Sequence, residues 1–174
     1  KEIQKGFLSS LPDIFLQKFY QALIESGVSF CVVVKENNSV VGFVSGVFNM
    51  NRFYIYFLKH YFFLSCFVLF PKFFSSFKKI MESFWYPQKE QLLPKAELLT
   101  IAIDKEYQGK GIGGSLLLEC IKEMKKKNIA VFKVVVGEEL VGAIRFYEKN
   151  NFTFLKNIII HGRAPSRVYL YHII

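Results

Sequence analysis

Residues 96–119, AELLTIAIDKEYQGKGIGGSLLLE, contain the pattern that decides the fold. An apolar run typical of a strand ends at Asp104, and a glycine cluster that begins at Gly109 opens directly into a helical pattern. Such a turn builds an anion site, because the first N–H groups of a helix lack intrahelical acceptors and lie at the positive end of its dipole. Glycine also lets a phosphate approach the backbone closely. The stretch therefore predicts that the chain binds a phosphorylated ligand.

Length and composition are those of an ordinary globular domain. The 174 residues are enough for one domain with a substantial core, and a hydrophobic content of 52% excludes global disorder. The formal charge of +9 favours an anionic partner, which can be a nucleotide cofactor, a nucleic acid or an anionic membrane. Charge alone does not choose among these three.

The cysteines predict a reducing compartment. Cys31, Cys66 and Cys120 are odd in number, form no C-x-x-C pair and lie in apolar runs, so we expect buried free thiols. Residues 1–6 are polar and no apolar segment adjoins them, which is not the pattern of a secretory signal. We therefore expect a cytoplasmic protein.

Helical and strand-like patterns alternate along the chain and predict a mixed α/β fold with a β-α-β unit in its middle. Gly42 and Gly46 interrupt one strand, which indicates a bulge or a close neighbour. Glu138 and Glu139 suit the positive end of a helix. In order, we predict a helix ended by Gly27, strands at 30–35 and 40–48 joined by an Asn37-Asn38 turn, an insert at 51–90, a strand at 96–104, a helix at 113–127, a strand at 130–136, a helix at 138–150, a strand at 152–160, a turn at 162–166 and a strand at 167–173.

The insert at residues 51–90 has two parts. Residues 53–70 contain 15 apolar residues in 18, interrupted by Lys59, His60 and Ser65, and such a segment must be buried in protein or lipid. Residues 71–86 form a basic amphipathic pattern. We predict a helical hairpin that lies over the domain as a lid, with peripheral membrane contact through 53–86 as the alternative. The charged pair at Lys59 and His60 makes a membrane span a poor interpretation.

The glycine cluster fits two familiar phosphate motifs poorly. Residues 109–114, GKGIGG, match the dinucleotide pattern G-x-G-x-x-G, but that motif places its first glycine at the strand end, and here residues 104–108 intervene. Glu138 lies at about the distance of the acidic residue in that motif. The Walker pattern fails because no Gly-Lys-Ser/Thr is present.

A third interpretation accounts for more of the chain. Gln108-x-x-Gly111-x-Gly113, between a strand and a helix, resembles motif A of the GNAT superfamily of acyl-CoA-dependent N-acetyltransferases, Q/R-x-x-G-x-G/A. Residues 143–152, AIRFYEKNNF, are similar to the family segment A-x-x-x-Y-E-K-x-G-F. The resemblance runs from about residue 7 to 173 and covers the insert poorly. Residues 140–142, LVG, depart from it, since many members carry a cofactor-contacting asparagine there.

The resemblance implies a single GNAT domain over residues 1–174, including the 51–90 helical insert. The family fold has a central mixed, mostly antiparallel twisted sheet, split at the cofactor site and flanked by helices. Its usual first strand has no counterpart in the printed sequence. The cosubstrate implied is acetyl-CoA, and no metal ligands are assigned. The resemblance implies cofactor contacts from the strand, the glycine turn and the later helix, at Ile101, Ala102, Ile103, Gln108, Gly109, Lys110, Gly111, Ile112, Gly113, Gly114, Ser115, Ala143 and Phe146.

Two residues match the catalytic positions of family members. Tyr147 matches the tyrosine that protonates the leaving thiolate, and we favour this role over the alternative that it packs on Phe152 in the core. Glu97 occupies the position of a general base, although it can equally be a solvent-facing strand residue. His60 and His161 are weaker base candidates. Acetyl transfer needs both roles, because a protonated amine must lose a proton and the thiolate must gain one.

The acceptor stays open at this stage. We expect transfer to a primary amine of a small molecule, such as a metabolite, an amino sugar or a glycan precursor. A protein N-acetyltransferase acting on lysine or an N-terminal amine is the first alternative, and a non-catalytic acyl-CoA-binding or RNA-binding module is the second. Residues 122–127 have the charge of an ordinary solvated helix face, so nucleic acid is disfavoured. A homodimer stays open.

Overall fold

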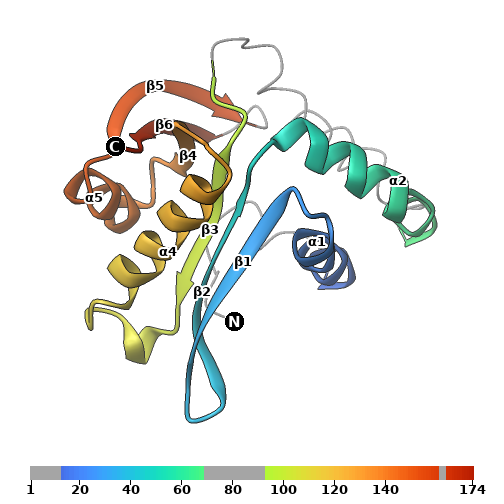
Figure 1. Ribbon diagram of the computed structural model, residues 1–174, viewed down its shortest axis with the longest axis horizontal. Helices are drawn as coiled ribbons and strands as arrows, with labels where there is room; N and C mark the ends of the chain where they lie inside the picture. Colours follow the sequence, from blue (N-terminus) through green and yellow to red (C-terminus); the bar gives the residue numbers. More distant parts are fainter. Residues whose placement is uncertain (1–12, 69–92, 161–163) are drawn as a thin grey trace.

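The computed structural model describes residues 13–68, 93–160 and 164–174 and arranges them as a six-stranded sheet between two sets of helices (Figure 1). The mixed α/β fold predicted from the sequence is confirmed, and the predicted order of helices and strands is confirmed over these residues. The elements are α1 (Asp13–Glu25), β1 (Ser29–Glu36), β2 (Ser39–Val47), α2 (Met50–Val68), β3 (Glu97–Ile103), a 3-10 turn (Lys105–Tyr107), α4 (Ile112–Lys126), β4 (Val131–Gly137), α5 (Val141–Lys149), β5 (Thr153–Ile160) and β6 (Ala164–His172).

The strand order is β1-β2-β3-β4-β6-β5, and only the central pair β3–β4 is parallel. That pair is in register only at Glu97 opposite Lys133 and Leu98 opposite Val134, so the two strands start together and then separate. The predicted split in the sheet therefore lies between β3 and β4. Because every other strand pair is antiparallel, the parallel sheet that a dinucleotide motif requires is excluded.

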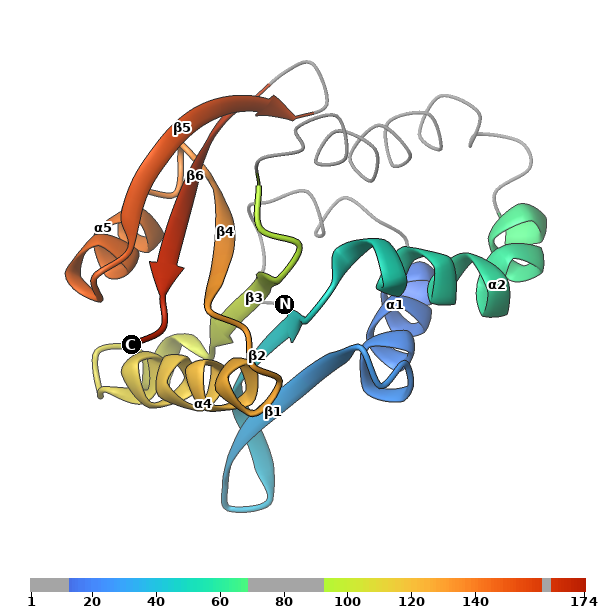
Figure 2. The same ribbon diagram turned by 45° about the horizontal axis from the view of Figure 1, so that its top comes forward.

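Helices α4 and α5 cover one face of the sheet and form the larger core with it (Figures 1 and 2). The buried face of α4 follows the helical spacing of its apolar residues, which the sequence predicted. Its buried side chains are Leu116, Leu117, Cys120 and Met124, and their partners on the sheet include Val44, Leu98, Phe132 and Val134.

Helices α1 and α2 lie on the opposite side of the sheet and share a second, mainly aromatic core (Figure 2). Phe19 of α1 packs edge-on against Phe53 of α2, with ring centroids 5.5 Å apart. The Tyr61 hydroxyl of α2 donates to Glu25 Oε2 of α1 at 2.8 Å. The first helix of the predicted insert is thus confirmed, whereas the amphipathic segment 71–86 lies outside the described residues.

The β1–β2 hairpin has the features that its residues predicted. Asn37 and Asn38 both have positive φ, 48° and 64°, as the tightest hairpin turns require. The β2–β3 register shifts between Ser45 and Gly46, which is a bulge. A Cβ at Gly46 would lie 2.7 Å from the Phe30 ring, so both the bulge and the close neighbour are present.

Two predicted boundaries are wrong. Helix α5 begins at Val141, not at Glu138, because the Glu138 N–H bonds to the Pro165 carbonyl of β6 and the Glu138 carboxylate pairs with Arg167. Strand β6 begins at Ala164, so residues 164–166 of the predicted 162–166 turn are strand, and residues 162 and 163 lie outside the described residues. In both places pairing with a distant strand overrides the local pattern.

Three further predictions concern thiols and membranes. Cys120 is buried and free, as expected, and burial raises the pKa of its thiol to about 12. Cys31 is free but only half-buried, and the Cys66 side chain lies outside the described ones. Within the parts of the chain that the structure describes, no helix has both the length and the apolar character that a membrane crossing requires.

Candidate functional site

The glycine turn between β3 and α4 has an exposed backbone. Gly109 and Gly111 have φ values of 77° and 84°, which side-chain-bearing residues rarely adopt, and a Cβ at either would meet no atom within 4 Å. The Gln108 amide donates from Nε2 to the Ile103 carbonyl at 3.0 Å. The side chain of Gln108 therefore fastens the turn to the end of β3, while the glycines leave the outer side of the turn open to a ligand.

The turn leads into α4 with Gly111 at its N-cap. The N–H of Ser115 is the first to bond back, to the Gly111 carbonyl at 3.2 Å, so the amides of residues 112–114 have no intrahelical acceptor. A Cβ at Gly113 would lie 3.2 Å from both Ile103 and Phe146. Gly113 therefore lets β3, α4 and α5 approach one another, whereas the position of a Cβ at Gly114 is open.

Lys110 brings a positive charge to this turn. Its ammonium lies over the Tyr107 ring, 4.8 Å from the centroid, in a cation–π contact on the exposed turn. The contact keeps the charge next to the glycines while leaving it in solvent. Together with the helix dipole of α4, it places positive charge beside the glycines.

The side of β3 that faces β4 has backbone groups outside the sheet ladder. On its other side, β3 pairs with β2 through Ile101, Ala102 and Ile103, opposite Val44, Phe43 and Gly42. Towards β4, pairing ends at Leu98, so among the described residues the peptide groups of β3 beyond it are outside the ladder and can form strand-like hydrogen bonds to an extended ligand. The split therefore offers a linear polar edge that runs towards the glycine turn.

Helix α5 closes the same side of the split. Ala143 and Phe146 are half-buried, and Phe146 reaches the start of α4. Tyr147 is buried, with its ring edge-on to Phe152 at 5.0 Å and to Phe146 at 5.4 Å. Burial, and secondarily Cys120, raises the pKa of the Tyr147 hydroxyl, which therefore stays protonated. Tyr147 packs on Phe152 in the core, which was one of the two predictions for this residue. Its protonated hydroxyl is also compatible with the other predicted role, that of a proton donor.

Glu97 lies at the closed end of the split and is not a solvent-facing residue. Its side chain is 12% exposed, and its Oε2 pairs with the Lys133 ammonium of β4 at 2.9 Å. The Lys133 side chain is 2% exposed and also donates to the Pro94 carbonyl at 2.7 Å. A half-buried carboxylate thus faces the region between the diverging strands, with a buried cation beside it.

More polar groups lie on the same face of the sheet, under α1 and α2. Burial raises the pKa of Tyr54 of α2 well above its ordinary value, and the charge of Glu97 adds to this effect. Ser45 and Thr100 are opposite each other on β2 and β3, and the Tyr20 hydroxyl of α1 reaches Thr100. The hydroxyls of Tyr20, Ser45 and Thr100 are buried, and among the described residues none completes a hydrogen bond of good geometry.

The polar residues of this face other than Glu97 were missed from the sequence, and Lys133 and Tyr54 show why. Lys133 interrupts the apolar strand 131–136, and a lysine in such a run requires a buried partner, so the signal was present. Tyr54 gives no comparable signal, because it lies in a segment that is apolar all round. Among the weaker base candidates, His60 is exposed and stacks on Tyr56, while His161 lies outside the described residues.

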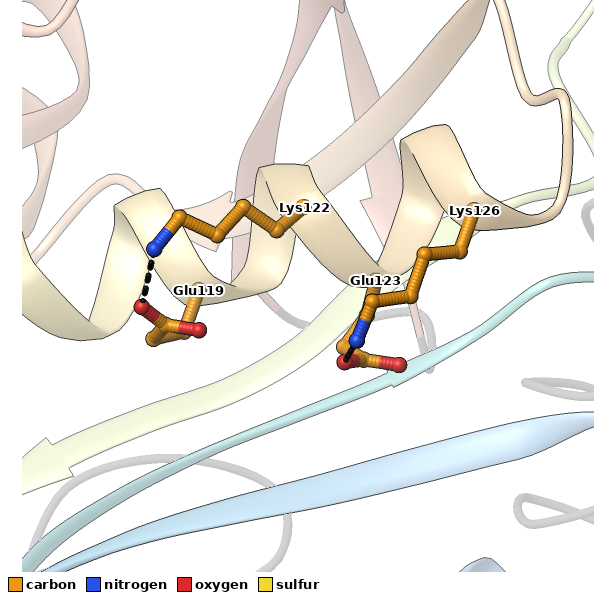
Figure 3. A network of polar contacts seen from close by, with 4 residues as sticks. All are labelled: Glu119, Lys122, Glu123 and Lys126. Atoms are coloured by element: carbon orange, nitrogen blue, oxygen red, sulfur yellow. Dashed lines mark hydrogen bonds and ion pairs between the residues drawn. The ribbon is translucent and has the colours of Figure 1, made fainter.

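Lys122 and Lys126 lie on the solvent face of α4, as Figure 3 shows. Lys122 pairs with Glu119 at 2.6 Å and Lys126 with Glu123 at 2.5 Å, both as i,i+3 contacts on an exposed surface. This is the solvated helix face that the sequence predicted, and the paired carboxylates offset part of its positive charge.

Comparison with known proteins finds its sequence matches in the segment that contains β3, the glycine turn, α4, β4 and α5. A model of the acetyltransferase (GNAT) family matches residues 79–152. The spermidine N(1)-acetyltransferase of Thermoplasma acidophilum is 45% identical over 58 residues, which are 33% of this chain and 36% of that protein. The [ribosomal protein bS18]-alanine N-acetyltransferase of Escherichia coli is 36% identical over 61 residues, 35% of this chain and 41% of that protein. The matches therefore span well under half the length of these relatives.

A solved structure extends the likeness to the whole fold. The PaiA N-acetyltransferase of Thermoplasma acidophilum in complex with coenzyme A superposes with a TM-score of 0.55 and 15% sequence identity, over 95% of this chain and 82% of that one. At this identity the likeness shows that the fold is shared. The shared fold also extends to strands outside the segment matched in sequence: β1 and β2 on one side of the split, and β5 and β6 on the other.

Proposed function

Because the chain belongs to the GNAT superfamily of acyl-CoA-dependent N-acetyltransferases, we propose that it transfers the acetyl group of acetyl-CoA to a primary amine by direct attack. The observation that carries the proposal is the split between β3 and β4, which opens beside the glycine turn at the start of α4. A long ligand with a pyrophosphate at one end and a thioester at the other matches this combination of an amide-lined turn and a polar strand edge.

In the proposal, acetyl-CoA is bound mainly by the backbone. The amides of residues 109–114 take the pyrophosphate, with Lys110 as a nearby point charge. The free edge of β3 at Ile101 and Ile103 takes the amide-bearing arm, as a neighbouring strand would. The open Cβ directions of Gly109, Gly111 and Gly114 support this assignment, because a phosphate can approach there without meeting a side chain.

The chemistry requires two proton movements that these residues can supply. The amine nitrogen forms a bond to the thioester carbonyl carbon, and the C–S bond breaks with its electron pair on sulfur. Glu97 accepts the proton that the ammonium loses before attack, and Tyr147 donates a proton to the leaving thiolate. The second proton lost by nitrogen replaces the one that Tyr147 donated, and Glu97 releases the first to solvent. The burial of both side chains supports these roles, because it keeps the proton transfers away from bulk water.

For the acceptor we favour a small amine that carries hydroxyl groups, such as an amino sugar or another metabolite. The three buried hydroxyls of Tyr20, Ser45 and Thr100 support this choice, because a polar acceptor can satisfy them. A protein acceptor is the second candidate. It is favoured by the relative named as a ribosomal protein alanine N-acetyltransferase.

We also infer that α2 acts as part of a lid over the acceptor face. Tyr54 supports this role, since the charge of Glu97 affects its hydroxyl and the helix therefore reaches the proposed base. Peripheral membrane contact through 53–86 is the alternative. Flotation with neutral and with anionic liposomes separates the two: binding to either would favour the membrane, and the absence of binding to both would favour the lid.

The test of the activity is an amine screen with acetyl-CoA, read as free thiol. Amino sugars, polyamines, and peptides with N-terminal alanine or internal lysine represent the acceptor classes. We expect amine-dependent thiol release that Lys122→Gln, on the solvent face of α4, leaves unchanged. Release with peptides alone would replace the small-molecule acceptor with a protein. Binding of acetyl-CoA without turnover on any amine would contradict the proposed enzyme.

A further inference from the structure

Lys133 is the most deeply buried charge among the described residues. The whole residue is 1% exposed. The side chains next to it on β4, Phe132 and Val134, belong to the core under α4. Because side chains alternate along a strand, Lys133 faces the other side, towards α1 and α2. There its ammonium contacts Glu97 at 2.9 Å and the Pro94 carbonyl at 2.7 Å.

Stability alone does not account for such a pair. Removing two charges from water costs several kcal/mol per ion, and well-packed apolar residues in place of a buried pair are often neutral or stabilising. The next residues along β4 on the same face of the sheet are Val131 and Val135, so this part of the strand accommodates valine. A lysine in this strand therefore needs a reason beyond packing.

The location of the pair supplies that reason. Glu97 and Lys133 are opposite each other in the first of the two registered β3–β4 pairs, after which the strands separate. The ammonium thus bridges the two strands at the closed end of the split. Through Pro94 it also holds the backbone that enters β3 from the insert. Three parts of the proposed acceptor side therefore meet at one nitrogen atom.

We propose that Lys133 is a positioning residue for the catalytic carboxylate: it fixes the orientation of Glu97 at the closed end of the split. This inference rests on the proposed acetyl transfer and on Glu97 as its base. Lys133 does not touch the reacting atoms. Its ammonium orients Oε2, which leaves the other carboxylate oxygen to face the acceptor.

The groups that face the pair come from three elements. From β3 the facing group is Glu97, from β4 it is Lys133 itself, and from α2 it is Tyr54, whose raised pKa keeps it neutral. Removing the ammonium therefore removes the charged partner that holds the Glu97 carboxylate in place.

The experiment compares Lys133→Met, Lys133→Arg, and the double variant Glu97→Gln with Lys133→Met, using the best amine from the screen. For Lys133→Met we expect kcat to fall about tenfold or more, which is part of the roughly 10²- to 10⁴-fold contribution of a positioned base. KM for acetyl-CoA should stay within about twofold, since the glycine turn is untouched. Lys133→Arg keeps the charge and should recover part of kcat.

The double variant separates positioning from folding. If Lys133 acts through Glu97, adding Lys133→Met to Glu97→Gln should change kcat little. The double variant leaves no unpaired buried charge, so it provides a folded protein even where Lys133→Met does not fold; thermal melting and acetyl-CoA calorimetry check this. An unchanged kcat in Lys133→Met, or an equal loss of kcat on both backgrounds, would overturn the inference alone. Absence of wild-type turnover would overturn the proposed function and this inference with it.

Discussion

The two sides of the split are built in different ways. On the donor side, the edge of β3, the glycine turn and the start of α4 come from one continuous segment, and they present mainly backbone groups. On the acceptor side, the polar groups are side chains from five elements: Tyr20 of α1, Ser45 of β2, Tyr54 of α2, Glu97 and Thr100 of β3, and Lys133 of β4.

The difference teaches how recognition is divided in this fold. Backbone amides at a helix N-terminus can bind any ligand with a suitably placed phosphate, so the donor side suits a cosubstrate common to a family. Buried side chains from separate elements can be exchanged one at a time without loss of the turn or the strand edge. We therefore expect changes on the donor side to alter acetyl-CoA binding, and changes on the acceptor side to alter chemistry and acceptor choice.

Glu97→Gln should give the largest effect. The amide keeps the shape but cannot accept the proton of the ammonium, so kcat should fall by about 10²- to 10⁴-fold and its rise with pH should weaken. Lys122→Gln, a similar removal of charge on the outer face of α4, serves as the matched control in the same assay. An identical pH profile in wild type and Glu97→Gln would remove Glu97 from the mechanism.

Tyr147→Phe comes next, with a loss in kcat of about 10²-fold and little change in acetyl-CoA affinity. Because burial raises the pKa of Tyr147 above its ordinary value of about 10, the hydroxyl stays protonated below that pH. The ratio of wild-type to variant kcat should therefore be constant from about pH 6 to about pH 9.5. A ratio that falls along an alkaline limb in this range would contradict the protonated state, and unchanged turnover would leave Tyr147 as a packing residue only.

Gly111→Ala tests the donor side and has a matched control at the other end of the same helix. Gly111 and Asn128 both have positive φ, 84° and 56°, at the two ends of α4. Alanine at either should destabilise the fold by about 1 kcal/mol, somewhat less at Asn128. Only Gly111→Ala should also weaken acetyl-CoA binding, by roughly tenfold, measured by calorimetry. Equal binding by both variants would show that the turn conformation does not matter for the cosubstrate.

Thr100→Val should give the smallest effect and is the most selective test of the acceptor side. Its hydroxyl completes no good hydrogen bond among the described residues, so a methyl group in its place should leave the thermal midpoint almost unchanged. KM for a hydroxylated amine should rise a few-fold, while KM for acetyl-CoA should not change. A changed KM for acetyl-CoA with an unchanged KM for the amine would assign Thr100 to the donor side instead.

The donor side could be predicted from the sequence because its signals are local. The strand up to Asp104, the glycines and the helix after them lie within one short segment, and both Gly109 and Gly111 adopt the positive φ that made them informative. Even there the sequence did not predict that Gln108 bonds to the Ile103 carbonyl or that Gly113 serves helix packing. Those roles depend on which atoms lie nearby, not on the motif.

The acceptor side could be predicted only in part, because long-range pairing assembles it. The position of Glu97 followed from motif spacing, but its partner Lys133 depends on the register of two strands that a turn and a helix separate. Thr100 turns towards α1 only because the register shift beside Ser45 changes the alternation of β3. The late start of α5 has the same kind of cause, since Glu138 is bound to β6 instead of opening the helix.

A crystal structure of the wild-type protein with acetyl-CoA tests the division into two sides most directly. The account predicts the pyrophosphate on the amides of residues 109–114, the pantetheine arm along β3 between Leu98 and Ile103, and the thioester beside Glu97 at the closed end of the split. Acetyl-CoA bound away from the glycine turn, or a thioester that points away from the face shared by Glu97 and Lys133, would contradict it.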